Sequence, residues 1–468
     1  MKKILSVFCA ILILACMLTI SSAFSADTDF VVEDGVLMSY TGTNTSVTIP
    51  SSVRVIGESA FENNTTIKSV KLHSNVYSIG DRAFYGCTSL STLSNHSSVK
   101  YVGAFAFYDT PFLFESTDEF LAVGSALVSY NGTLSSVTLP DSICSISPYA
   151  FLRNKTITSF KAGDKLTSIC EGAFYECDLL ASVDVTDSVS FIGADAFYST
   201  KWLENSTDFV TLGDDILVAY NGALSAVSVP STIKQIAPNA FYGNTSVTSL
   251  NVPSSVFSIG ARAFMNCANL QSITLTNGLI MIDEEAFANC SKLSCVELPF
   301  TTGLIGKGAF INCSKLSYAF IRGNNVVLSK GAFAYCSSLE VALMSSDVAS
   351  VSDDAFASCT KLSAISVPPE IIMISSKAFS SGCDPVVVCD KGSFADSALS
   401  NSLNVSFNRG DCNVDGYVDV MDATNIQRYI AKDIDLPLYN LAFADADFDA
   451  EVTVLDASYV QRFIAELL

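Results

Sequence analysis

The feature that most constrains the fold is a short motif that recurs along most of the chain. An Ala-Phe pair occurs in thirteen copies with a 23-residue period, which is interrupted by a longer gap only after Phe107 and after Phe197. A fixed period of this length is typical of a solenoid, in which each unit buries its apolar face only against its neighbours. The repeated aromatic residues are Phe61, Phe84, Phe107, Phe151, Phe174, Phe197, Phe241, Phe264, Phe287, Phe310, Phe333, Phe356 and Phe379.

Each ordinary repeat predicts a strand, a turn and a short helical segment. Residues 270–275 alternate between apolar and polar side chains, as a strand with one buried face does. Ile282 and the next Ala-Phe pair follow, and we expect that pair on a short helical or 3₁₀ turn. Stacked units of this kind form an α/β solenoid, with a parallel sheet on one side, short helices on the other and one continuous core.

A longer repeating unit explains both long gaps. Tyr40, Tyr130 and Tyr220 are equally spaced and mark three related segments. Two of these segments contain Asn-Gly, at residues 131–132 and 221–222, between runs of β-forming residues. Because Asn-Gly supplies the positive φ angles of a two-residue turn, we expect inserted β-hairpins there in place of the helical half of a repeat.

The N-terminus predicts export from the cell. Two lysines precede an apolar run from Ile4 to Ile20 and then small residues, which is the pattern of a signal peptide over residues 1–25. A lipoprotein cut before Cys16 is the alternative, although Leu14 is large for that motif and the apolar run continues past Cys16. No later stretch has the roughly 18 uninterrupted apolar residues of a membrane span. We therefore expect a secreted chain with no membrane span.

Seven cysteines lie at the third position after a repeat phenylalanine. In a secreted protein, cysteines first suggest disulfides. Their regular phase favours instead a ladder of small buried thiols, a role that free cysteine fills well. The best candidates for a real bridge are Cys383 and Cys389, near the end of the array. The seven are Cys87, Cys177, Cys267, Cys290, Cys313, Cys336 and Cys359.

The regular period and the Ala-Phe-x-x-Cys element together resemble the BspA-like leucine-rich repeats of bacterial surface and secreted proteins. The resemblance covers about residues 29–380. It implies a curved solenoid that contacts proteins or surfaces, and it does not name the ligand. We assign residues 26–384 to this leucine-rich repeat solenoid.

Residues 385–408 depart from the period and predict a C-terminal cap. Residues 386–388 favour a strand, residues 393–402 favour a short helix, and residues 403–407 alternate again. A solenoid needs an atypical last unit that covers the exposed end of its core. The composition changes sharply after residue 408, where a second domain begins.

Two acidic segments in this second domain carry oxygen ligands at the spacing of a calcium loop. Residues 411–422 read DCNVDGYVDVMD, and a second copy begins at Asp445. Ca²⁺ is a hard cation that takes several oxygen ligands at once, which explains acidic residues at alternate positions. Tyr417 and Glu451 would each supply a backbone carbonyl. The first set of ligands is Asp411, Asn413, Asp415, Tyr417, Asp419 and Asp422, and the second is Asp445, Asp447, Asp449, Glu451, Thr453 and Asp456.

Each loop is followed by a related amphipathic helix, over residues 423–431 and 457–468. Two such loop-helix units resemble a type I dockerin, the module that attaches proteins to cellulosome scaffoldins by binding a cohesin, and we assign residues 409–468 to it. The resemblance implies that loop positions 10 and 11 and the following helix contact the cohesin, in either of two orientations. These contacts would come from Val420, Met421, Gln427, Arg428, Val454, Leu455, Gln461 and Arg462. The apolar residues among them could instead belong to the core.

One position of the second loop departs from the family pattern. Ala450 occupies the place where a calcium loop has glycine, as Gly416 does in the first loop. An alanine there must adopt a strained positive φ or change the turn. We therefore expect two Ca²⁺ sites, of which the second binds more weakly.

The charge of the chain excludes one class of partner. A net charge of −21 argues against nucleic acid, whose phosphates need a basic surface. Residues 411–468 carry twelve acidic and three basic residues, a net charge of −9, and a solvated acidic tail is the simpler interpretation of that segment. Because the acidic residues have the ordered spacing of a loop, we favour calcium binding.

The sequence offers few candidates for catalysis. Only His73 and His96 could act as histidine bases, and we expect both to be exposed strand or turn residues. Trp202 aligns with Phe112 of the preceding long unit, which favours packing over sugar stacking. A polysaccharide lyase would need acidic calcium ligands and a basic residue on an insertion, and the period over residues 241–379 is unbroken.

These observations predict a secreted, non-catalytic cellulosome component. The repeats would bind a protein or surface ligand, and the dockerin would bind the cohesin of a scaffoldin in a calcium-dependent way. A polysaccharide-degrading enzyme (lyase or hydrolase) carried by the dockerin, and an adhesin attached to a cell-surface cohesin, are the alternatives. We expect no enzymatic activity, no nucleic-acid partner and an extracellular location in a cellulosome or at the cell surface.

Overall fold

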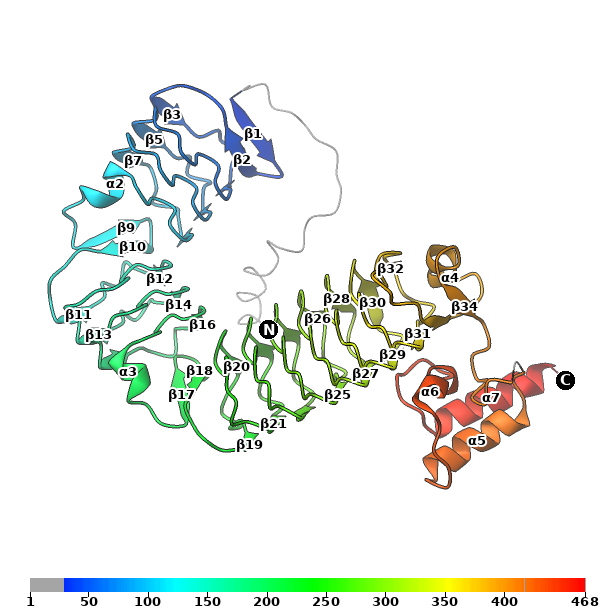
Figure 1. Ribbon diagram of the computed structural model, residues 1–468. Coiled ribbons are helices and arrows are strands. Elements are labelled where there is room, and N and C mark those ends of the chain that lie inside the picture. The colour runs from blue at the N-terminus through cyan, green and yellow to red at the C-terminus, as the bar shows by residue number, and fades with distance from the viewer. Residues whose placement is uncertain (1–28, 416, 468) are drawn as a thin grey trace. The chain divides into compact units, whose positions relative to one another are not determined.

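The computed structural model describes residues 29–415 and 417–467 and divides into two compact units. The first unit contains residues up to 206 together with 212–216, and the second contains residues 207–211 and 217–468. Both units are built from stacked repeats, and the second also contains a helical C-terminal domain (Figure 1). The predicted signal peptide, residues 1–25, lies outside the described residues.

Each ordinary repeat contributes two short strands to two separate parallel sheets. In one repeat these are β23 (Ser272–Leu275) and β24 (Met281–Ile282). Ser249 pairs with Ser272 and Ser258 pairs with Met281, so strands of adjacent repeats pair one sequence period apart. The parallel-sheet solenoid that the period predicts is therefore confirmed.

The first unit contains two blocks of repeats, each with a five-stranded and a three-stranded sheet. In the first block the five-stranded sheet has the order β1 (Phe30–Glu33), β2 (Val36–Tyr40), β4 (Val55–Ile56), β6 (Ser78–Ile79), β8 (Tyr101–Val102), and the other sheet has the order β3 (Ser46–Thr48), β5 (Ser69–Lys71), β7 (Thr92–Ser94). In the second block the five-stranded sheet has the order β16 (Phe191–Ile192), β14 (Ser168–Ile169), β12 (Ser145–Ile146), β10 (Ala126–Tyr130), β9 (Phe120–Val123). Its three-stranded sheet has the order β11 (Ser136–Thr138), β13 (Ser159–Lys161), β15 (Ser182–Asp184).

The second unit contains the unbroken part of the repeat array and three sheets. The nine-stranded sheet has the order β17 (Phe209–Leu212), β18 (Ile216–Tyr220), β20 (Gln235–Ile236), β22 (Ser258–Ile259), β24, β26 (Leu304–Ile305), β28 (Val326–Leu328), β30 (Val348–Val351), β32 (Met373–Ile374). A three-stranded sheet has the order β19 (Ala226–Ser228), β21 (Ser249–Val252), β23. A six-stranded sheet has the order β25 (Cys295–Glu297), β27 (Tyr318–Ile321), β29 (Val341–Met344), β31 (Ala364–Ser366), β33 (Val386–Val388), β34 (Asn404–Ser406).

Hydrogen-bonded turns, rather than the expected short helices, connect the two sheets in the ordinary repeats. Phe264 N donates to Ala286 O of the next repeat over 2.7 Å, so the turns stack as the strands do. Arg262 and Asn266 have positive φ angles of 57° and 63°, and such residues interrupt a right-handed helix on both sides of the phenylalanine. Short helices are found in the two long units, at α2 (Pro111–Phe114) and α3 (Lys201–Glu204).

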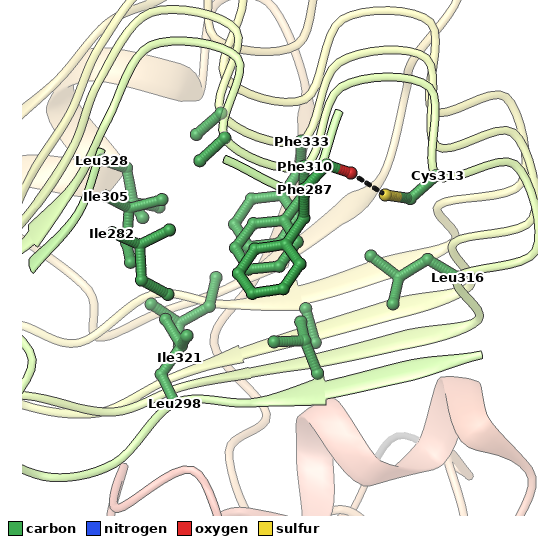
Figure 2. Packing of buried hydrophobic residues seen from close by; sticks show 14 of the residues in the cluster. Ile282, Phe287, Leu298, Ile305, Phe310, Cys313, Leu316, Ile321, Leu328 and Phe333 are labelled. Atoms are coloured by element: carbon green, nitrogen blue, oxygen red, sulfur yellow. Dashed lines mark hydrogen bonds between the residues drawn. The ribbon is translucent and has the colours of Figure 1, made fainter. Parts of the chain in front are cut away.

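The repeat phenylalanines form a column of stacked rings in the core, as Figure 2 shows for three of them. The ring centroids of Phe287 and Phe310 are 5.2 Å apart with an angle of 2° between the ring planes, and those of Phe310 and Phe333 are 5.1 Å apart. All thirteen phenylalanines are buried. Since burying one phenylalanine side chain stabilises a fold by about 1.5–3 kcal/mol, the column is a principal source of stability in every repeat.

Other aromatic residues begin and end the column of a block. In the second block, Tyr130 begins the column at 5.0 Å from Phe151, and Trp202 ends it at 4.8 Å from Phe197. Phe112 ends the column of the first block in the same way. Trp202 therefore has the packing role that its alignment with Phe112 predicts.

The inserted β-hairpins are present, but the prediction of their turns was wrong. β1 pairs with β2 and β9 pairs with β10 in antiparallel register, and the turns lie at residues 34–35 and 124–125. The positive φ angles there belong to Asp34, Gly35 and Gly124. The Asn-Gly pair at residues 131–132 follows β10 instead. A Cβ at Gly132 would lie 2.4 Å from the Tyr130 ring, and one at Gly222 would lie 2.5 Å from the Tyr220 ring, so these glycines permit close packing on a tyrosine.

The seven ladder cysteines are buried free thiols that donate hydrogen bonds to repeat phenylalanines. Cys313 Sγ donates to Phe287 O over 3.2 Å (Figure 2), and the other six make the equivalent bond at 3.0–3.3 Å. The candidate bridge between Cys383 and Cys389 is absent, because both are buried free thiols and Cys383 continues the ladder beside Cys359. No disulfide links any of the cysteines that the structure describes.

The segment after the repeats has a strand, a helix and a strand, in the order that the sequence predicts. β33 pairs with β31 and with β34, and α4 (Phe394–Leu399) lies between them in sequence. The C-terminal domain then contains α5 (Val420–Ile430), α6 (Leu438–Ala444) and α7 (Val454–Leu467). None of the helices in the described parts of the chain is long and apolar enough to cross a membrane.

Candidate metal centre and the helix face beside it

The first acidic loop folds so that its side-chain oxygens face its own backbone. Asp415 N donates to Asp411 Oδ1 over 3.1 Å and to Asn413 Oδ1 over 2.9 Å. Asp422 Oδ1 accepts from Asn413 N over 3.2 Å, which joins the last ligand position to the start of the loop. Asp411 and Asp422 are buried although they are carboxylates. Gly416 lies outside the described residues.

The second loop repeats this network at the equivalent positions. Asp449 N donates to Asp445 Oδ1 over 3.1 Å and to Asp447 Oδ1 over 3.2 Å. Asp456 Oδ1 accepts from Asp447 N over 3.1 Å, and Asp456 Oδ2 accepts from Thr453 N over 2.7 Å. One carboxylate oxygen from each of Asp445, Asp447 and Asp449 lies within 4.8 Å of the others. The second loop therefore brings three of its predicted acidic ligands together, and the first loop has the equivalent hydrogen bonds.

The electrostatics of the second loop fit a bound cation. Burial, followed by the charge of Asp456, raises the pKa of Asp445 well above its usual value. Burial also raises the pKa of Asp449 and of Asp456. These carboxylates repel one another at close range, and a hard divalent cation with oxygen ligands would offset that repulsion. In the first loop, burial raises the pKa of Asp422 in the same direction.

The helices begin inside the loops, three residues earlier than predicted. Asp419 is the N-cap of α5, and its Oδ1 accepts from Met421 N over 2.7 Å. Asp422 Oδ2 accepts from Asp419 N over 2.8 Å, which completes a capping box. Thr453 Oγ1 accepts from Leu455 N over 3.1 Å at the start of α7. The residues at loop position 9 thus cap the helices, so loop and helix are one structural unit.

One face of α5 and α7 packs in the core of the domain and the other is exposed. Ile426 and Val460 are buried in a shared cluster, and Cys412 of the first loop joins them. The apolar pairs at loop positions 10 and 11 are exposed, which excludes the alternative that they are core residues. Their exposed fractions are 64% for Val420, 54% for Met421, 61% for Val454 and 55% for Leu455, and Gln427, Arg428, Gln461 and Arg462 are exposed as well.

Ala450 has the positive φ that its loop position requires. Its φ angle is 62°, so the alanine accepts the left-handed conformation rather than changing the turn. Its side chain is fully buried, in a cluster that also contains Val341 and Leu343 of the repeat array. This alanine therefore lies in an apolar cluster that the second loop and the solenoid share.

Sequence reasoning missed α6 and the surface that it covers. Leu441 and Phe443 of α6 are buried against Val341 and Leu343 of β29. The sequence does contain a signal for this contact, because residues 341–344 are apolar without interruption. A strand that is buried on both faces has such a run, whereas a strand with one exposed face alternates.

The two histidines have local structural contacts. His73 Nδ1 accepts from Asn75 N over 3.2 Å, and His96 Nδ1 accepts from Gly124 N over 3.0 Å. Both side chains are half-buried rather than exposed. Each histidine therefore stabilises a turn of the solenoid through its ring nitrogen.

Comparison with protein-family models finds two matches. The model of the BspA type leucine rich repeat region matches residues 37–120, 116–211, 217–340 and 327–395, and the model of the dockerin type I domain matches residues 409–465. Both are domains of non-catalytic types. No curated protein matches the chain significantly.

Several solved structures are similar to this chain. A leucine rich cell surface protein from Faecalibacterium prausnitzii is 23% identical, with a TM-score of 0.29, over 81% of this chain and 98% of that one. A leucine rich repeat protein from T. pallidum is 28% identical, with a TM-score of 0.32, over 38% of this chain and 86% of that one. The pneumococcal vaccine antigen PcpA is 16% identical, with a TM-score of 0.33, over 80% of this chain and 95% of that one.

Proposed function

Because this chain belongs to the BspA type leucine-rich repeat family and carries a C-terminal type I dockerin domain, we propose that it is a secreted, non-catalytic component of a cellulosome. In this proposal the dockerin binds a cohesin module of a scaffoldin when calcium is bound. The repeats bind a protein or surface ligand, and residues 1–25 are the signal peptide that directs export.

Calcium would occupy both loops of the dockerin. The support for this is chemical: each loop has buried carboxylates and oxygen donors at alternate positions, and in the second loop three carboxylate oxygens lie close together, which is the donor set that Ca²⁺ prefers. The ligands would be the two sets of six residues named from the sequence. Ala450 gives the second loop a strained backbone, so its intrinsic affinity would be lower than that of the first loop.

The exposed face of α5 and α7 would be the cohesin-binding surface, and this face is the observation that carries the proposal. Eight residues at equivalent positions of two related helices are exposed, while the opposite side of the same helices forms the domain core. Exposed valine, leucine and methionine side chains beside arginines are typical of an interface core with a polar rim. Because the two halves are equivalent, cohesin could bind in two orientations.

The solenoid would act by contact rather than by catalysis. In the first unit, the longer strands present serine, threonine, lysine and aspartate to solvent, as Ser159 and Lys161 of β13 do. These side chains vary from repeat to repeat while the core stays constant, so a ligand would be recognised across several repeats. This surface is distinct from the dockerin face.

Capture by immobilised cohesins tests this proposal. The full chain, after removal of residues 1–25, is applied to a panel of cohesins with calcium and again with a chelator. We expect retention on at least one cohesin with calcium and loss of retention with chelator. If no cohesin in the panel retains the chain, with calcium or with chelator, the docking function is contradicted.

A second assay tests the absence of catalysis. The same chain is incubated with a panel of plant polysaccharides, and the release of reducing sugar and of unsaturated products is measured. We expect no product above that of a heat-denatured control. Release of either product by the native chain alone would support a carbohydrate-active enzyme instead.

A further inference from the structure

The longer strands of the second unit carry side chains that point away from the core, at what we call outward positions. In β21, β23 and β25 these alternate with core residues such as Leu250. β21 pairs with β23 and β25 pairs with β27, while β25 lies beside β23 one sequence period further along, so the outward positions form two rows that run from repeat to repeat. In these three strands the rows contain Ser249, Ser272 and Cys295, and Asn251, Thr274 and Glu297. They are polar apart from Cys295, as expected for a face in contact with water.

The outward positions change character at β27. From β27 to β33, seven of the eight outward positions are apolar, and four of those seven are fully buried. We call this surface the apolar platform. Its first row contains Tyr318, Val341, Ala364 and Val386, and its second contains Phe320, Leu343, Ser366 and Val388. Consecutive repeats have apolar residues at these outward positions. Since a contiguous apolar surface of this kind is typical of a contact site, we expect another part of a protein to cover the platform.

The dockerin of the same chain covers this platform. Leu441 and Phe443 of α6 are buried in one cluster with Leu343 and Val388, and Ala450 of the second loop is buried there too. Figure 1 shows α6 beside β29 and β31, in agreement with their contacts. The apolar surface of the solenoid therefore ends where the dockerin contact ends.

Polar contacts connect the second loop to the edge of the platform. Arg322, whose side chain is 10% exposed, forms ion pairs with Glu451 of the loop and, at 3.4 Å, with Glu297 of β25. Ser346 N donates to Phe448 O over 2.8 Å, within the loop backbone. Ser366 Oγ donates to Asp445 Oδ2 over 3.4 Å, so a solenoid hydroxyl contacts the first ligand of the loop.

The connection between the two parts is also fixed by contacts. Arg409 lies between the cap and the dockerin: Nη1 is 3.4 Å from Asp390 Oδ1, and the guanidinium lies 4.7 Å from the ring centroid of Phe448 and 4.5 Å from that of Tyr459. Gly410 N donates to Phe443 O over 2.8 Å. These contacts order the short connection in one conformation.

The first loop packs elsewhere. Cys412 of that loop lies in the cluster with Ala457 and Val460 of α7, and Cys412 O accepts from Asn440 Nδ2 over 2.8 Å. The two loops are therefore equivalent in sequence and different in surroundings. The second is part of the platform contact, and the first belongs to the dockerin core.

We propose that the apolar platform is the docking surface for this chain's own dockerin, and that calcium in the second loop and docking on the platform stabilise each other. The inference rests on the proposed calcium binding of the second loop. Ala450, Phe448 and Asp445 meet the solenoid in the closed shape of the loop, and bound calcium would stabilise this same shape by drawing its ligands together. Coupling between two events is reciprocal, so loss of docking must weaken that calcium site.

Docking leaves the proposed cohesin face free. Val420 and Leu455, near the starts of α5 and α7, are exposed while α6 lies on the platform. The solenoid and a cohesin would therefore contact different sides of the dockerin. The repeats would hold the cohesin face in a fixed orientation instead of carrying it on a flexible tether.

Calcium titration of the full chain tests this coupling. Leu343→Arg places a charge in the platform without touching the solenoid core, and Thr274→Arg makes the same change at the equivalent position of β23 as the matched control. We expect Leu343→Arg to weaken one of two calcium sites by roughly 5- to 150-fold, the usual range of such coupling. The other site and the Thr274→Arg chain should keep the affinities of the unchanged chain. Two unaffected sites in a Leu343→Arg chain with a native circular dichroism spectrum would overturn the inference.

A charge reversal tests the same contact through the ion pair of Arg322 and Glu451, with circular dichroism as the check that each variant folds. Glu451→Arg should weaken the same calcium site, and the double variant Arg322→Glu/Glu451→Arg should restore part of the loss because the ion pair is reformed with opposite polarity. Equal affinities in all three chains would count against docking. A chain in which neither loop binds calcium would instead refute the calcium binding of the proposed function.

Discussion

A thiol at the third position after seven of the repeat phenylalanines fits the core for two reasons. It is small enough to stack on the thiol of the next repeat, and it donates to the carbonyl oxygen of a phenylalanine in the preceding repeat, as Cys313 does to Phe287. Burial raises the pKa of Cys177 and of Cys267 to about 12, so these thiols stay protonated. The sequence predicted the ladder from its phase, but the hydrogen bond became visible only once the neighbouring repeat was placed.

Removing one rung tests the structural role of the ladder. We expect Cys313→Ala to lower the free energy of unfolding by about 1–3 kcal/mol, because it deletes a buried hydrogen bond and leaves a small cavity. Cys295→Ala, at a half-buried outward position of β25, is the control and should have little effect. Urea denaturation followed by circular dichroism measures both. Equal losses in the two variants would contradict a special role for the ladder.

At the scale of elements, the sequence predicted the existence of structures better than their ends. The hairpins are present, yet their turns lie at residues 34–35 and 124–125. A glycine can supply a positive φ or can allow a close approach, and Gly132 allows close packing on Tyr130. The dockerin helices start early because Asp419 and Thr453 cap them. Both errors have one cause: a local motif states which conformations are permitted, and the contacts of the neighbouring strand or loop decide which is used.

The equality of repeat period and strand register makes a prediction about deletion. Removing residues 281–303, one full period, should let β26 pair with β22 in the register that β24 now has. The array should stay folded and be one repeat shorter. Removing residues 281–292 should shift the following phenylalanines out of the column and destabilise the array. Circular dichroism and cooperative thermal unfolding distinguish the two chains. Equal midpoints of thermal unfolding for the two chains would show that strand register does not control the stability of the array.

The equivalence of α5 and α7 predicts how cohesin binding responds to substitution. Val420→Asp/Met421→Asp alone, or Val454→Asp/Leu455→Asp alone, should leave binding through the other orientation. The four substitutions together should weaken binding at least about 30-fold, since a central interface residue is worth about 2 kcal/mol or more. Surface plasmon resonance on the captured cohesin measures this, and circular dichroism checks helix content. Complete loss with one pair would contradict two equivalent orientations.

At the scale of the whole molecule, the period determined the repeat fold and local spacing determined the calcium loops. The contact between dockerin and solenoid was not predicted, because it joins residues far apart in sequence: Arg322 and Glu451 are separated by 129 positions. Its signal was the switch from polar to apolar outward positions at Tyr318, which is visible only when repeats are aligned by strand register. Ala450 shows the same limit. Within its loop, Ala450 replaces the glycine that the turn favours. In the folded chain, the same alanine is buried in one apolar cluster with Leu343 of the solenoid.

The central claim is that this dockerin binds cohesin through a calcium-ordered fold. The most direct measurement is isothermal titration of a cohesin retained in the capture assay into the full chain, with calcium and again after chelation. We predict saturable binding with one cohesin per chain in calcium and no measurable heat of binding after chelation, restored when calcium is added back. Binding of equal affinity with and without calcium would contradict the account.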